Sequence, residues 1–126
     1  MSNLFYNLAL LSTCLLFHKA GANTPCNFTS HLYSGNFTNF GISDISILKD
    51  NQLYNTSVKF WGRTISCNNE KLLCNKNNVI LPQNNSDCLV KNLNQYHINP
   101  DIQYDEKKNQ INIEVYGNDI ILYPSN

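Results

Sequence analysis

Residues 51–67 have the sequence NQLYNTSVKFWGRTISC, and β-forming side chains dominate this stretch from Tyr54 onward. We predict one long strand here, with side chains alternating between two faces. One face is mostly apolar and is predicted to point toward the core: Tyr54, Thr56, Val58, Phe60, Gly62 and Thr64. The other is mostly polar and is predicted to face water: Asn55, Ser57, Lys59, Trp61, Arg63 and Ile65.

Trp61 is the only tryptophan of the chain, and two interpretations of it stay open. A lone tryptophan is usually mostly buried, which favours a position under a loop or a second sheet. The alternative is an exposed ring between the cations Lys59 and Arg63, which suits an anionic or sugar ligand or a protein partner. The candidate binding surface is therefore Lys59, Trp61 and Arg63.

Residues 1–22 have the pattern of an export signal. An apolar run over residues 8–17 is too short to span a bilayer, and small residues at positions 20–22 suit cleavage. We therefore predict a signal peptide over residues 1–22 and a single secreted β-rich domain over residues 23–126. No second long apolar run follows in the sequence, so no transmembrane anchor is predicted.

Five cysteines occur in the chain, and four of them follow the predicted cleavage site: Cys26, Cys67, Cys74 and Cys88. An even count in a small exported domain predicts two disulfides. Spacing does not decide among the three possible pairings, but we favour Cys67–Cys74 as a local bridge and Cys26–Cys88 as a long-range one. A zinc site is disfavoured because the C-x2-C spacing is lacking, so no metal or other cofactor is predicted.

Four Asn-x-Ser/Thr sequons predict N-glycosylation, at Asn27, Asn36, Asn55 and Asn84. Because a glycan must point to solvent, the sequon at Asn55 agrees with the predicted water-facing side of the long strand. Together with the export signal, the sequons indicate eukaryotic secretion.

Alternating or apolar runs bounded by turn residues predict most of the remaining chain to be β-structure. The predicted strands cover residues 41–48, 79–81, 101–104, 111–116 and 120–123, with residues 23–39 as a polar entry loop. One helix is predicted over residues 86–96, capped by Ser86 or Asp87 and pinned at Cys88. The predicted fold class is mostly β (α+β possible): a small antiparallel β-sandwich or barrel-like meander with one short helix and two disulfides.

The composition disfavours several classes of function. The formal net charge is zero, so no basic face is predicted to hold nucleic acid. The two histidines of the predicted domain, His31 and His97, lie in unrelated contexts, and no catalytic motif occurs. We therefore predict no catalytic residue and no enzyme.

The leading hypothesis is an extracellular binding or effector module whose partner is a protein or a glycan; the sequence gives no oligomeric state. The first alternative is a carrier of a small apolar ligand, held between the sheet and the predicted helix. Its cavity would be a few hundred Å3 in volume and lined by Val58, Phe60, Leu93 and Ile113. The second alternative is a secreted enzyme inhibitor that uses the loop between Cys67 and Cys74.

Overall fold

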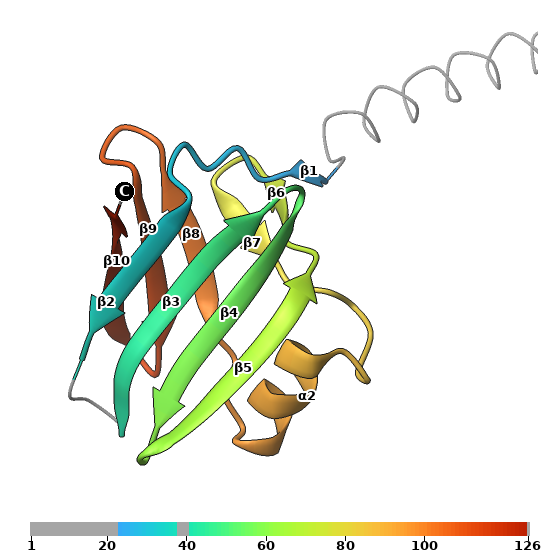
Figure 1. The fold of residues 1–126 in the computed structure, drawn as a ribbon, viewed down its shortest axis with the longest axis vertical. Helices are drawn as coiled ribbons and strands as arrows, with labels where there is room; N and C mark the ends of the chain where they lie inside the picture. Colours follow the sequence, from blue (N-terminus) through green and yellow to red (C-terminus); the bar gives the residue numbers. More distant parts are fainter. Residues whose placement is uncertain (1–22, 38–40, 126) are drawn as a thin grey trace, which may run out of the picture.

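The structure is a computed structural model and describes residues 23–37 and 41–125. The predicted signal peptide therefore lies outside the described residues. Within them, ten antiparallel strands form one sheet that curls into a half-barrel, and one short helix lies beside its β5 edge (Figure 1). With its two disulfides, this mostly β arrangement confirms the predicted fold class.

The elements follow each other along the chain with short connections. They are β1 (Thr24–Pro25), β2 (Leu32–Asn36), β3 (Ile42–Asp50), β4 (Leu53–Phe60), β5 (Arg63–Glu70), β6 (Leu73–Asn75), β7 (Asn78–Ile80), α2 (Cys88–Gln95), β8 (Asp101–Asp105), β9 (Gln110–Val115) and β10 (Asn118–Ser125). The strand order is β1-β6-β7-β8-β9-β10-β2-β3-β4-β5. The pairing of β10 with β2 therefore joins the C-terminal strands to the N-terminal ones.

The polar segment over residues 23–39 is not only the predicted entry loop, because it contains β1 and β2. β2 pairs with β3 on one side and with β10 on the other, so it lies inside the sheet. Tyr33 is its buried side chain, and Gly35 lies so close to the backbone of Ile121 that a Cβ atom would clash. The sequence gives little signal for β2 because its two neighbours, rather than an apolar pattern, define it.

The predicted long strand is a hairpin in the structure. β4 ends at Phe60 and β5 begins at Arg63, and the two residues between them, Trp61 and Gly62, have φ angles of 51° and 78°. Positive φ at both central residues is what a type I′ hairpin turn requires. The predicted faces hold along β4 but are reversed along β5, where Ile65 is partly buried and Thr64 is exposed.

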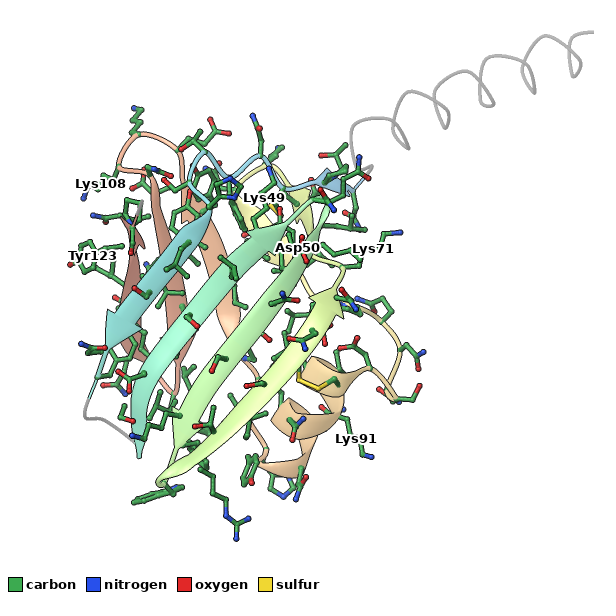
Figure 2. The ribbon with its side chains drawn as sticks, viewed as in Figure 1. Lys49, Asp50, Lys71, Lys91, Lys108 and Tyr123 are labelled. Carbon is green, nitrogen blue, oxygen red and sulfur yellow. A yellow bond between two sulfur atoms is a disulfide. The ribbon has the colours of Figure 1, made fainter. Side chains whose placement is uncertain are left out.

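The four cysteines form two disulfides, as predicted, but the favoured pairing is wrong. Cys26 bonds Cys74 with a Cα–Cα distance of 4.8 Å, and Cys67 bonds Cys88 at 5.6 Å. The first pair forms because β1 pairs with β6, which brings Cys26 beside Cys74. The second pair ties β5 to the first turn of α2 (Figure 2).

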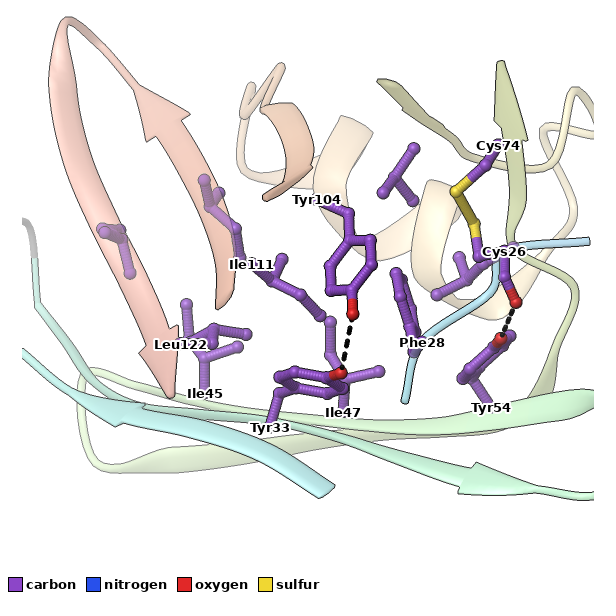
Figure 3. Packing of buried hydrophobic residues seen from close by; sticks show 14 of the residues in the cluster. Cys26, Phe28, Tyr33, Ile45, Ile47, Tyr54, Cys74, Tyr104, Ile111 and Leu122 are labelled. Carbon is purple, nitrogen blue, oxygen red and sulfur yellow. Dashed lines mark hydrogen bonds between the residues drawn. A yellow bond between two sulfur atoms is a disulfide. The ribbon is translucent and has the colours of Figure 1, made fainter. Parts of the chain in front are cut away.

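Aromatic rings fill one end of the interior, which we call the aromatic end. Phe28 lies edge-on to Tyr33, Tyr54 and Tyr104, with ring centroids 4.8–5.4 Å apart (Figure 3). The Tyr54 hydroxyl donates to the Cys26 carbonyl at 3.2 Å, so this buried ring has a polar partner. The rings thus combine close packing with satisfied hydroxyl groups, as buried tyrosines require.

Candidate ligand-binding site

α2 forms where the sequence predicts a helix, and local bonds define both of its ends. The Asp87 side chain accepts from the backbone N–H of Leu89 at 3.1 Å and of Val90 at 3.2 Å. At the other end, His97 has a φ of 56° and Ile98 donates its N–H to the Leu93 carbonyl at 2.9 Å, a Schellman-type closure. The disulfide at Cys88 pins the start of the helix, as predicted, but its partner is Cys67 of β5 and not the favoured Cys26.

Between α2 and the sheet lies an apolar cavity of about 90 Å3, which we call the inner cavity. Its walls include Val58, Leu93 and Ile113, three of the four residues that the sequence predicts to line such a cavity. Its one hydroxyl belongs to Thr56 and donates to the Cys67 carbonyl at 3.3 Å. Because that hydroxyl is already bonded, the lining offers no free hydrogen-bond partner to water.

A second hollow, of about 230 Å3, lies beside the inner cavity and is lined by aromatic rings. We call it the mouth. Phe60, Trp61, Tyr96 and Tyr116 contribute the rings, and the Phe60 centroid lies 4.9 Å from Tyr96 and 5.9 Å from Trp61. Ile98 lines the mouth, the inner cavity and a smaller hollow of about 30 Å3 between them. The three hollows are therefore adjacent.

Two hairpin turns of the same kind supply the exposed rings of the mouth. Trp61 and Gly62 connect β4 to β5, and Tyr116 and Gly117 connect β9 to β10; all four residues have positive φ. Trp61 is 72% exposed and Tyr116 is 62% exposed. The favoured interpretation of Trp61 as a buried core residue is therefore wrong. A repeated aromatic–Gly pair at the end of a strand is the sequence signal that would have located both turns.

Two contacts with Gly41 hold Trp61 in place. Its backbone N–H donates to the Gly41 carbonyl at 2.9 Å, and a Cβ atom at Gly41 would collide with the indole ring. The Tyr116 hydroxyl donates to the His97 carbonyl at 2.5 Å, which links the β9–β10 turn to the end of α2. Both rings are held in place by these contacts although they face solvent.

The two cations of the predicted binding surface lie on opposite faces of the hairpin. Lys59 pairs with Thr64 and lies on the outer face of the sheet, whereas Arg63 pairs with Phe60, whose ring lines the mouth. Directly paired residues of an antiparallel ladder share a face, so Arg63 lies on the cavity side. Both side chains are exposed. Arg63 thus shares a face with Phe60 and follows the Trp61–Gly62 turn without itself lining the mouth, and Lys59 belongs to the opposite face.

A buried carboxyl group, which the sequence did not single out, lies at the start of α2. Glu70 is 1% exposed, and its Oε1 accepts from the Leu89 N–H at 3.1 Å. Its Oε2 has no hydrogen-bond partner among the described residues. Burial, followed by the hydrogen bond with Asp87, raises the pKa of Glu70 to about 7. The contact joins the end of β5 to the start of α2, 19 residues further along the chain, so only the fold reveals it.

Cys67, Glu70 and Cys88 place possible metal-ligand atoms within 4.8 Å of one another. Both sulfur atoms belong to the disulfide, and a disulfide sulfur lacks the thiolate that metals bind. The group therefore cannot hold a metal ion in this oxidised state.

The four sequon asparagines lie away from the inner cavity and its mouth. Asn27, Asn36 and Asn84 are exposed, and Asn55 lies half-buried on the outer face of β4. The Asn55 Oδ1 accepts from the Asn69 N–H at 3.0 Å, which leaves its amide nitrogen for a glycan. Lys49, Lys71, Lys91 and Lys108 point outward from separate parts of the molecule and do not form one basic patch (Figure 2).

Comparisons with protein-family models, with curated proteins and with solved structures found no match to this chain. Over residues 23–37 and 41–125, no helix has the length and apolar character needed to cross a membrane. The fold and its two disulfides define a small disulfide-bonded β-rich domain, which is compatible with an extracellular module.

Proposed function

We propose that this chain is a secreted, N-glycosylated binding module that takes a small apolar ligand through the aromatic mouth into the inner cavity. The observation that carries the proposal is the apolar hollow between α2 and the sheet, which adjoins the exposed rings of Trp61 and Tyr116. Binding sites for small molecules are typically concave and apolar, with aromatic walls. The role needs binding alone, without a chemical step.

The inner cavity and the exposed rings of the mouth are unfavourable for stability, which supports a role in binding. Protein interiors are normally close-packed, and a cavity of this kind lowers stability. Trp61 and Tyr116 expose large rings to water, and exposed apolar patches commonly mark binding sites.

The dimensions favour a small ligand. An engineered apolar cavity of about 150 Å3 holds benzene, so the inner cavity of about 90 Å3 has room for about three or four carbon atoms. It is smaller than the few hundred Å3 that the sequence analysis expected. A longer ligand would continue into the mouth, where its remaining atoms would lie between the rings of Phe60, Trp61 and Tyr96.

The exposed sequons and the two disulfides support export. All four sequon asparagines are at least partly accessible, and glycans at these positions would leave the mouth open. The same arrangement would shield the outer face of β4 around Asn55. We therefore place the binding surface of the module at the mouth.

Calorimetric titration of the secreted protein with n-octanol tests the proposal. We expect saturable binding with a negative heat-capacity change, which marks burial of apolar surface. Val58→Phe fills the inner cavity from β4 and Leu93→Phe fills it from α2, so each should weaken binding at least tenfold. Leu48→Phe on the exposed outer face of β3 is the matched control and should bind as the parent does.

Near-ultraviolet circular dichroism of each variant verifies its fold. Absence of octanol binding to the folded parent protein would refute the proposal. Undiminished binding by both folded filling variants would also refute it, because the ligand would then lie elsewhere.

A further inference from the structure

We infer that the ligand carries a carboxylate head group and that Arg63 binds this group at the mouth. The inference rests on the proposed function and names the chemical class of the ligand: a small carboxylic acid with an unbranched apolar tail. The tail would occupy the inner cavity, and the head would remain at the exposed end.

Arg63 has the position that this role needs. It is the first residue of β5 and pairs directly with Phe60, whose ring lines both the mouth and the adjoining small hollow. It is also the only arginine of the chain. A guanidinium group presents two parallel N–H donors to a carboxylate, whereas the aromatic walls of the mouth offer no comparable partner.

The charge of Arg63 is not already neutralised. Among residues 23–37 and 41–125, no carboxylate forms an ion pair with it. The residues that line the mouth are all uncharged, so no acidic group there competes for the guanidinium group. An anionic head would therefore meet a free cation at the rim.

The end of α2 does not oppose an anion as strongly as an open helix end would. Ile98 and His97 donate their N–H groups to the carbonyls of Leu93 and Asn94, at 2.9 Å and 3.1 Å. These bonds satisfy two of the carbonyl groups that carry the negative end of the helix dipole. What α2 adds to the mouth is the ring of Tyr96.

The charges of the hairpin favour a ligand with one carboxylate over a ligand with several negative charges. Lys59, the other cation of the hairpin, lies on the outer face of the sheet, opposite Arg63. One guanidinium group can bind one carboxylate through two hydrogen bonds. The arrangement thus points to one negative charge attached to an apolar tail.

A series of ligands with the same tail and different heads tests the inference. We expect octanoate to bind the secreted protein about three- to tenfold more tightly than n-octanol, because an accessible charge-assisted contact contributes modestly. Octylammonium should bind most weakly of the three. The preference for octanoate should decrease with added salt, since the pair is exposed to solvent.

Two charge-removing variants on the same hairpin identify the residue. Arg63→Gln should abolish the preference for octanoate over n-octanol. Lys59→Gln removes an equally exposed cation from the opposite face and should keep the preference.

The outcomes separate the two proposals. Failure of all three ligands to bind would refute the proposed function itself. Equal affinities for the three heads would leave apolar binding intact and refute the carboxylate inference. A preference that persists in Arg63→Gln, or one that disappears in Lys59→Gln, would show that Arg63 is not the partner.

Discussion

The two ends of the interior are packed in different ways. At the aromatic end, Phe28 lies against three tyrosine rings, and the buried disulfide of Cys26 and Cys74 closes the packing. At the other end, aliphatic side chains surround the inner cavity, and Trp61 stands exposed at its mouth. The same strands run through both ends. The difference indicates that the aromatic end stabilises the domain and that the cavity end is available for binding.

The largest effect on stability is expected when a phenylalanine ring is removed at each end and the two losses are compared. Phe28→Ala removes a fully enclosed ring and should lower the free energy of unfolding by about 3 to 5 kcal/mol. Phe60→Ala removes a half-buried ring at the mouth and should lower it by about 1 to 2 kcal/mol, because less packing is lost. Urea denaturation measures both. Equal losses would mean that the two ends do not differ in their contribution to stability.

A pH-dependent effect is expected from Glu70, at the start of the helix that walls the cavity. Its pKa is about 7 in the folded protein and 4.5 ordinarily, so the folded state holds this proton more tightly. The resulting stabilisation is fully present below pH 4.5 and is lost as the pH rises through 7. The loss amounts to about 3 kcal/mol by linkage.

Glu70→Gln removes the ionisable group and tests this expectation. The variant should match the parent protein near pH 4 and exceed its stability by up to about 3 kcal/mol near pH 8, in urea denaturation at a series of pH values. Glu106→Gln, in the exposed β8–β9 turn, is the control and should follow the parent. Parallel pH profiles for Glu70→Gln and the parent would contradict the assignment.

The smallest effect is expected from filling the cavity by one methylene group. Val58→Ile extends a side chain into the inner cavity and should raise the free energy of unfolding by about 0.5 to 1 kcal/mol. The same substitution should weaken n-octanol binding, because the tail and the added group compete for one space. A destabilised Val58→Ile would indicate that this end is as tightly packed as the aromatic end.

Local patterns predicted those parts of the fold that are themselves local. The spacing of Leu89, Leu93 and Tyr96 after Asp87 encodes the helix, because caps and periodicity act within a few residues. Residues 101–104 and 111–116 likewise predicted the hairpin of β8 and β9. The disulfide pairing was missed because it depends on which strands meet, and separations along the chain do not contain that information.

Local alternation also predicted part of the candidate site. The alternation along β4 placed Val58 and Phe60 on the inner face, where they line the hollows. The β-forming residues on both sides of Trp61 outweighed the single turn signal of Gly62, so the turn was missed and Arg63 was assigned to the wrong face. Glu70 and Tyr116 join the site only through tertiary contacts, which no local pattern could indicate.

The emission of Trp61 tests the central claim most directly, because it is the only tryptophan and lines the mouth. The protein is titrated with n-octanol while the indole emission is recorded, with Val58→Phe as the blocked control. The proposed site predicts a saturable shift to shorter wavelength as ligand replaces water around the ring, and no such shift in Val58→Phe. An unchanged emission spectrum throughout the titration, in a protein that stays folded, would contradict ligand entry through this mouth.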